Sequence, residues 1–317
     1  MPRKLLKSKA LLKGETVGLI GLASPVRPDL FQSGCSYIEK AGLKAAVPVD
    51  PSKFYGDYTY LFSANSVEER LRALYSLYQD KNVSAVLSVR GGYGSMELLP
   101  HLKFDLLRSN AKVTVGFSDA TAFLIALYQA AGLAVIHGPS LVTLGPRCEK
   151  SSDAATSISK LLELLRGEIA NPFEGMVFEE VAGCSKPGIG RLIGGNLSIL
   201  AALSGTPWQP MCRNHILFFE ETGEEPYRIH RMLTQMKLAG VFEGLKGVLV
   251  GQCNGYESNE DFKPKVRDVV RDVFNEYSVP VLQGLPFGHG DLNFPIPIGI
   301  EARIFENKLE LLEKSVL

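Results

Sequence analysis

From Thr16 to His137 the sequence alternates short apolar runs with longer amphipathic stretches, a pattern typical of parallel strands joined by crossover helices. The apolar runs are rich in Val, Leu, Ile and Ala, as strands covered on both faces tend to be. We therefore predict an α/β fold whose first half is a doubly wound parallel sheet. The predicted strands are Val17–Ala23, Lys44–Val49, Ala85–Val89, Lys112–Gly116 and Ala134–His137.

Two predicted helices lie between these strands. One follows Ser66, because Glu69 three residues later completes a capping box before an apolar stripe of helical spacing. The other runs from Asp119 to Gly132 directly after a predicted strand. The first half of the chain therefore contains the strand-to-helix turns at which α/β proteins place their ligands.

The second half has a more mixed pattern, which indicates a second domain. The segment Asn171-Pro172-Phe173-Glu174-Gly175 has the composition of a linker. We predict an N-terminal α/β domain over 1–165, a linker over 166–175 and a smaller mixed α/β domain over 176–317. Its predicted elements are a helix after Asn196, strands His215–Phe219 and Gly247–Val250, helices Pro226–Leu238 and Lys265–Tyr277, and a hairpin of Ile298–Phe305 and Lys308–Leu312 turning at Glu306-Asn307.

The charge balance and the cysteines restrict the classes of function. The chain has 34 Lys and Arg residues and 34 Asp and Glu residues, a net charge of zero that argues against a nucleic-acid-binding protein. No apolar run approaches the length of a membrane span, and the N-terminus does not have the pattern of a signal peptide. The five cysteines are odd in number and far apart, which favours free thiols in a reducing compartment. We expect a cytoplasmic protein without membrane or nucleic-acid partners.

The segment from Lys112 to Phe123 carries a serine at a strand–turn–helix junction. Ser118 follows the strand that ends at Gly116 and precedes the helix that begins at Asp119, in the pattern G-x-S-x-A. Such a turn lifts a hydroxyl above the sheet, beside backbone N–H groups that stabilise negative charge on an attacked carbonyl. Ser118 is thus a candidate nucleophile. The alternative is that Ser118 only caps the helix.

A glycine-rich loop ends the neighbouring predicted strand. Arg90-Gly91-Gly92-Tyr93-Gly94 follows Val89 directly, and consecutive glycines let backbone N–H groups approach a reacting oxygen. Neither this loop nor the first strand turn completes a dinucleotide or phosphate-loop motif, so no cofactor is predicted. The alternative interpretation is that the loop is only a tight turn.

A serine nucleophile needs a base and an orienting carboxylate. Among the five histidines, His289 stands out because Gly288 and Gly290 flank it in a loop rich in proline and glycine. His137 follows a strand, where a structural hydrogen bond is the simpler interpretation. Glu220 and Glu221 end an apolar strand, where a carboxylate can be held and aimed at an imidazole. An acidic, solvated turn is the alternative.

Together these segments resemble the serine LD-carboxypeptidase family, which includes muramoyltetrapeptide carboxypeptidases and microcin C immunity peptidases. The resemblance covers nearly the whole chain and adds further ordered motifs: Ala23-Ser24-Pro25, His137-Gly138-Pro139, Gly194-Gly195-Asn196-Leu197, Pro226-Tyr227-Arg228 and Arg231-Met232-Leu233. It implies a flavodoxin-like first half, a homodimer and a triad of Ser118, His289 and Glu220. Many members carry Glu-Asp where this chain has Glu220-Glu221, and we assign the orienting role to Glu220.

The resemblance also implies a reaction. Ser118 would attack the L,D amide that joins D-alanine to a murein tetrapeptide, and an acyl-enzyme would follow, without a metal or cofactor. The oxyanion would bind the backbone N–H of Asp119 and one from Gly91 or Gly92. Arg90, Arg228 and Arg231 are candidates to bind the substrate carboxylate, and Tyr93 is a further candidate substrate contact. The alternatives are a peptidase for aminoacyl-nucleotide amides, as in microcin immunity, and a non-catalytic module that binds a small ligand.

Overall fold

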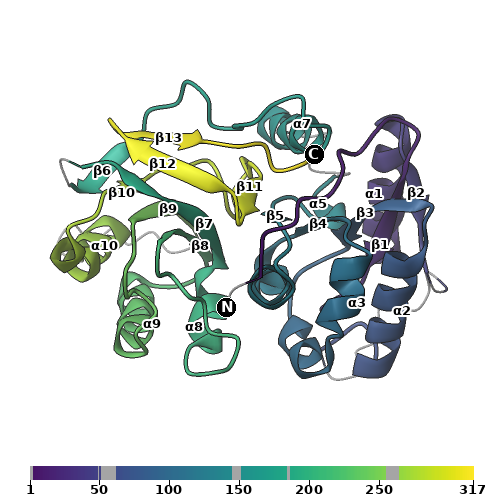
Figure 1. The fold of residues 1–317 in the computed structure, drawn as a ribbon, viewed down its shortest axis with the longest axis horizontal. Helices are drawn as coiled ribbons and strands as arrows, with labels where there is room; N and C mark the ends of the chain where they lie inside the picture. Colours follow the sequence, from purple (N-terminus) through teal and green to yellow (C-terminus); the bar gives the residue numbers. More distant parts are fainter. Residues whose placement is uncertain (1–2, 49, 51–61, 145–150, 184–185, 255–263) are drawn as a thin grey trace.

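A computed structural model describes residues 3–48, 50, 62–144, 151–183, 186–254 and 264–317. Within these residues the strands form two sheets that lie side by side, each flanked by helices (Figure 1). The elements of the first half are β1 (Thr16–Ile20), α1 (Pro28–Lys40), β2 (Lys44–Ala46), α2 (Val67–Gln79), β3 (Val83–Ser88), η2 (Ser95–His101), α3 (Phe104–Ser109), β4 (Val113–Gly116), η3 (Ser118–Ala120), α4 (Thr121–Ala126), η4 (Leu127–Ala131), β5 (Val135–His137), α5 (Leu141–Leu144) and α7 (Ser152–Leu165).

The first sheet confirms the predicted fold class. Strands β1 to β5 are parallel, in the flavodoxin-like spatial order β2-β1-β3-β4-β5. Helix α2 begins after the N-cap Ser66, whose hydroxyl accepts a hydrogen bond from the Glu69 N–H. The capping box therefore marked the start of this helix correctly. Val49, at the end of one predicted strand, lies outside the described residues.

One strand of this sheet comes from the other end of the chain. Strand β11 (Ile296–Ile298) pairs antiparallel with β5, so that Ile298 lies opposite Val135. The prediction that Ile298 begins the C-terminal hairpin was wrong, because the chain turns away after Ile298 and the hairpin strand begins at Glu301. The last part of the sequence thus joins both sheets.

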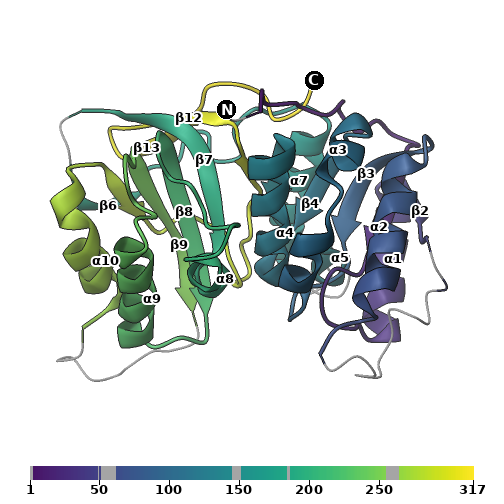
Figure 2. The same ribbon diagram turned by 60° about the horizontal axis from the view of Figure 1, so that its bottom comes forward.

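The second sheet has the order β13-β12-β7-β8-β9-β10-β6, in which β7 to β10 are parallel. Helices α8, α9 and α10 lie along one side of it (Figure 2). The predicted hairpin turn is confirmed, since Glu306 and Asn307 both have positive φ, as a two-residue hairpin turn of type I′ requires. The elements are β6 (Glu179–Ala182), β7 (Gly188–Asn196), α8 (Leu197–Leu203), β8 (His215–Thr222), α9 (Pro226–Leu238), β9 (Gly247–Asn254), α10 (Val266–Phe274), η5 (Asn275–Tyr277), β10 (Val281–Gln283), β12 (Glu301–Phe305) and β13 (Lys308–Leu311).

Strand β7 was missed because its glycines interrupt the apolar pattern. Gly195 has φ +149°, and a Cβ atom built on it would lie 2.4 Å from the Thr121 hydroxyl at the start of α4. The next residue donates its N–H to the same hydroxyl, at 3.0 Å from Asn196 N to Thr121 Oγ1. Gly195 therefore allows β7 of the second sheet to pack closely against the start of α4. This packing is a tertiary contact, so local sequence patterns do not reveal it.

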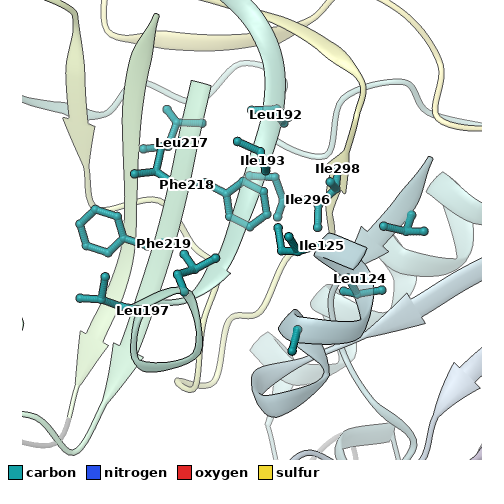
Figure 3. Close-up of a cluster of buried hydrophobic side chains, with 14 of the residues drawn as sticks. Leu124, Ile125, Leu192, Ile193, Leu197, Leu217, Phe218, Phe219, Ile296 and Ile298 are labelled. Carbon is teal, nitrogen blue, oxygen red and sulfur yellow. The ribbon is translucent and has the colours of Figure 1, made fainter. Parts of the chain in front are cut away.

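The two halves share one apolar core. Ile125 of α4 lies beside Ile193 of β7 and Ile296 of β11 (Figure 3), and Leu124 and Leu192 belong to the same buried cluster. All five side chains are fully buried. Because close-packed cores deform little, this packing holds the end of β4 and the strands of the second sheet in a fixed relation. The domain boundary over 166–175 stays a prediction.

Two further expectations concern compartment and membrane. Within the described ranges, no helix combines the length and the apolarity that a bilayer crossing needs. Cys35, Cys212 and Cys253 are free thiols, and Cys148 and Cys184 lie outside the described residues. The predicted cytoplasmic location stays a prediction.

Candidate active site

Ser118 lies at the turn between β4 and α4. Phe117 continues the extended backbone of the strand, and Ser118 then takes φ +59°, in the left-handed region. A side chain with a Cβ atom costs about 1–2 kcal/mol in this conformation, and such strain is concentrated at functional turns. The turn therefore has the geometry that the G-x-S-x-A pattern predicts.

Hydrogen bonds join three of the predicted site residues. The Oγ atom of Ser118 lies 3.1 Å from Nε2 of His289, and Nδ1 of His289 lies 2.6 Å from Oε2 of Glu220. Because an ionised carboxylate only accepts hydrogen bonds, Nδ1 donates to Glu220 and Nε2 of the neutral ring accepts from Ser118. Residues 118, 220 and 289 thus come from both halves of the chain and meet in the order hydroxyl, imidazole, carboxylate.

The carboxylate of Glu220 is fully buried on β8. Burial raises the pKa of Glu220, and the hydrogen bond and charge of His289 lower it again in part. The charge of Glu220 is therefore most favourable when the imidazole beside it is protonated. A buried carboxylate in this position can stabilise an imidazolium.

The His289 ring is held from two sides. The next residue in the loop, Gly290, donates its N–H to the side-chain oxygen of Gln252 at 2.7 Å. The ring of Phe117 packs against the imidazole with a centroid distance of 4.6 Å. The loop and the strand end thus hold the imidazole between Ser118 and Glu220.

The glycine-rich loop lies against the serine turn. A Cβ atom built on Gly91 would lie 2.8 Å from Cβ and 3.0 Å from Oγ of Ser118, and 3.3 Å from the Asp119 nitrogen. Only a glycine leaves this space open. The backbone of Gly91 and the N–H of Asp119 therefore border the volume into which an oxygen bound to Ser118 would extend.

The Asp119 side chain ties the serine turn to the glycine loop. Its Oδ2 accepts from the Ser95 N–H at 2.8 Å, and the Ser95 hydroxyl donates to the Asp119 carbonyl at 2.5 Å. Burial raises the pKa of Asp119, and the Ser95 hydrogen bonds offset part of that effect. Below the loop, the buried Arg70 guanidinium donates to the Gly94 carbonyl at 2.9 Å. Asp119 and the end of the glycine-rich loop are therefore held by side chains that sequence motifs did not point to.

Replacing Gly91 with alanine is expected to lower kcat about a hundredfold, an effect comparable to removing one oxyanion-hole donor, because the methyl group displaces the oxyanion from its donors. Gly91 has no positive φ, so alanine can adopt its backbone conformation, and the added methyl group enters the space beside Ser118. Hydrolysis rates and thermal unfolding of G91A check this. If the variant had both the stability and the kcat of wild type, the space beside Ser118 would not be the site of the oxyanion.

A second histidine is buried beneath the site. His137 is fully buried at the end of β5, and its ring packs against Phe117 at 5.1 Å and Phe218 at 5.7 Å. Among the described residues neither ring nitrogen has a hydrogen-bond partner, so the predicted structural hydrogen bond is not found there. Burial lowers the pKa of His137 to about 3, with a smaller contribution from His289. His137 is therefore neutral in the folded protein near neutral pH.

His137 is expected to make the protein sensitive to acid. Its pKa is lowered from 6.5 to about 3, so the unfolded chain takes up this proton first, and stability is complete above pH 6.5 and falls below it. Between pH 6.5 and pH 5 the loss is about 2 kcal/mol in the free energy of unfolding. His137→Phe should remove this part of the pH dependence. Denaturant unfolding at pH 7.5 and pH 5 checks it, and an unchanged difference between the two pH values would refute it.

The predicted substrate-binding residues lie in different settings. Arg90 donates to the Pro25 carbonyl at 2.7 Å, and the ring of Tyr93 is half exposed. On α9, Arg228 forms an ion pair with Glu224, and the Arg231 guanidinium lies 5.4 Å from the centroid of a neighbouring tyrosine ring. The contacts of Arg228 and Arg231 with neighbouring side chains therefore do not link them to Ser118. Their role in substrate binding stays a prediction.

Sequence reasoning missed Asn196 as a site residue. Its side-chain amide lies 3.3 Å from both Glu220 Oε1 and Glu221 Oε1. The signal was the Gly194-Gly195-Asn196 motif, which carried no chemical role by itself. In the described part of the chain, no group of three or more His, Cys, Asp or Glu side chains is placed to hold a metal ion.

Comparisons with known proteins show the family to which the chain belongs. The model of the LD-carboxypeptidase N-terminal domain matches residues 17–138, and that of the C-terminal domain matches residues 189–304. A probable murein peptide carboxypeptidase of Bacillus subtilis (strain 168) is 32% identical over 93% of this chain and 90% of its own length. The chain belongs to the LD-carboxypeptidase family. As a member of this family, the protein is a peptidase.

Two further proteins similar to this chain have names that refer to different activities. The crystal structure of a muramoyltetrapeptide carboxypeptidase from Oxalobacter formigenes matches with a TM-score of 0.77 and 26% identity, over 93% of this chain and 97% of that one. The microcin C7 self-immunity protein MccF of Escherichia coli is 26% identical over 96% of this chain and 94% of its own length. Both matches extend over nearly the whole chain.

Proposed function

We propose that the protein is a serine LD-carboxypeptidase that releases terminal D-alanine from murein tetrapeptides, with Ser118, His289 and Glu220 as its catalytic triad. The observation that carries the proposal is the pair of hydrogen bonds from Ser118 through His289 to Glu220, 3.1 Å and 2.6 Å long. The names of the Bacillus subtilis relative and of the Oxalobacter formigenes structure support a murein peptide as substrate.

In the first half of the reaction an acyl-enzyme forms. The Ser118 oxygen bonds to the carbonyl carbon of the L,D amide while its proton passes to Nε2 of His289. The resulting oxyanion accepts hydrogen bonds from the Asp119 N–H and from one N–H of Gly91 or Gly92. When the intermediate collapses, the C–N bond breaks, and the D-alanine amine leaves with the proton from His289.

In the second half water replaces the amine. His289 takes a proton from the water as the water oxygen attacks the ester carbonyl, and the proton then returns to the Ser118 oxygen when the C–O bond breaks. Glu220 keeps Nδ1 protonated throughout, so that Nε2 can alternate between accepting and donating. The peptide leaves as a tripeptide with a free carboxylate.

Substrate choice is tested by offering two amides to the same enzyme. The tetrapeptide L-Ala–γ-D-Glu–meso-diaminopimelate–D-Ala and an aminoacyl sulfamoyl adenosine are supplied in equal amounts, and mass spectrometry follows both. We expect the tetrapeptide to be cleaved and the nucleotide analogue to stay largely intact. Faster cleavage of the nucleotide analogue would favour the microcin-immunity type of activity, which the likeness to MccF keeps as the second candidate.

A non-catalytic binding module is less well supported. A serine that only capped a helix would need neither the strained φ of +59° nor an imidazole nitrogen 3.1 Å away. Covalent modification of Ser118 by a fluorophosphonate would count against a binding module, whereas an inert Ser118 would favour it.

The homodimer implied by the family resemblance belongs to the same proposal. Light scattering of the purified protein measures its mass directly, and twice the chain mass of 34.6 kDa is the expected result. A mass of one chain at the concentrations used for activity would refute the dimer without affecting the proposed reaction.

A further inference from the structure

Glu221, next to the proposed catalytic carboxylate, is a second buried carboxylate. Its side chain is 3% exposed on β8, and the carboxylate points away from His289 toward the start of α8. Oε2 accepts from the N–H and from the hydroxyl of Ser198, both at 2.7 Å, and Oε1 accepts from the Thr222 N–H at 2.8 Å. These donors give both oxygens of the Glu221 carboxylate hydrogen-bond partners.

Asn196 connects the two carboxylates. Its Oδ1 accepts from the Ile199 N–H at 3.3 Å and caps α8, so its Nδ2 must face the glutamates. Nδ2 lies 3.3 Å from Oε1 of Glu220 and 3.3 Å from Oε1 of Glu221. The amide therefore occupies the oxygen of Glu220 that does not bind His289, and leaves Oε2 for the imidazole.

The charge of Glu221 is solvated but not neutralised by these contacts. In the described structure its donors are the N–H and hydroxyl of Ser198, the Thr222 N–H and the Asn196 amide, all of them electrically neutral. In a buried site the negative charge therefore acts on neighbouring groups with little screening. It opposes the charge on Glu220 and favours a positive charge on His289.

We propose that Glu221 is a positioning residue of the triad: a fixed negative charge that, through Asn196 and Glu220, favours transfer of the Ser118 proton to His289. This inference rests on the proposed serine mechanism. Among the residues that the structure describes, titratable groups near the triad include His137 on β5, Asp119 after β4 and the Cys253 thiol on β9. Burial keeps His137 and Cys253 in their neutral forms, and Glu220 and Glu221 raise the pKa of Cys253 further, so neither supplies a competing charge.

The test is the pH dependence of covalent labelling of Ser118 by a fluorophosphonate. In this reaction the Ser118 oxygen bonds to phosphorus, fluoride leaves, and the serine proton passes to His289. The labelling rate is measured from pH 5 to pH 9 for wild type, Glu221→Gln and Ser198→Ala, with circular dichroism to confirm folding. Because the Gln amide places an NH2 group among donors, Glu221→Ala is measured as a second neutral replacement that leaves room for water.

The labelling rate falls at low pH, and this fall is the acid limb of the pH profile. We expect both neutral replacements to move the acid limb to lower pH, by on the order of one pH unit. The plateau rate should fall about tenfold, because a less basic imidazole is a poorer proton acceptor. Ser198→Ala keeps the charge of Glu221 and should leave the acid limb in place. Folded Glu221 variants with the wild-type acid limb would overturn the proposal and assign Glu221 a structural role only.

Labelling needs no peptide substrate, so the two proposals can fail separately. A wild-type protein that is labelled at Ser118 but leaves the tetrapeptide intact would refute the proposed substrate and leave the test of Glu221 in force. A wild-type protein that is not labelled at any pH would refute the serine mechanism, and the role of Glu221 with it.

Discussion

Ser118→Ala should lower the rate of D-alanine release by about four to six orders of magnitude while the protein stays folded. The hydroxyl supplies the attacking atom and makes its hydrogen bond to His289 at 3.1 Å, and the substitution leaves the other two triad members in place. Release of D-alanine measured with purified protein, together with thermal unfolding, checks the prediction. Activity within a hundredfold of wild type would mean that another group attacks the amide.

Comparing Ser118→Gly with Ser118→Ala measures the backbone strain at this turn. Glycine adopts φ +59° without the penalty of a Cβ atom, so this inactive variant should be more stable than Ser118→Ala by about 1 kcal/mol in the free energy of unfolding. Equal stability of the two variants would show that the turn is not strained, without affecting the role of the hydroxyl.

Glu220→Gln should lower kcat about a thousandfold to ten-thousandfold. If the Gln oxygen keeps the hydrogen bond from Asn196, its NH2 group faces Nδ1 of His289. The ring would then have to accept at Nδ1 and carry its proton on Nε2, where it cannot take a proton from Ser118. Steady-state hydrolysis above neutral pH measures the effect.

The control for Glu220→Gln is Glu243→Gln, which removes an exposed carboxylate paired with Arg213 on the surface. This control should keep activity within about twofold of wild type, since exposed ion pairs contribute little. A Glu220→Gln variant that loses less than tenfold in kcat would contradict the assignment of the orienting carboxylate and direct attention to Glu221.

Much of the first sheet could be predicted because its strands are short, apolar and separated by recognisable helix signals. The strands contributed by the second half of the chain were harder to predict. Strand β7 contains Gly195, which lets it approach Thr121 closely, and β11 pairs with a strand more than 150 positions earlier in the sequence. Neither the close approach of β7 nor the pairing of β11 leaves a periodic pattern in the sequence, because tertiary contacts and not local propensity determine both.

For the candidate site, the sequence predicted which residues take part better than it predicted the contacts that orient them. Ser118 and the glycine loop follow neighbouring parallel strands, and parallel strands end at the same edge of a sheet, so their meeting followed from topology. The direction of a side chain does not follow in this way. That Glu220 faces His289 while Glu221 faces Ser198 depends on the local geometry of β8 at residues whose types are identical.

The most direct measurement is the release of free D-alanine from L-Ala–γ-D-Glu–meso-diaminopimelate–D-Ala, followed by mass spectrometry with wild type and Ser118→Ala side by side. We expect tripeptide and D-alanine in equal amounts with wild type and neither product with the variant. An intact tetrapeptide after prolonged incubation with wild type, or equal release by both proteins, would contradict this expectation.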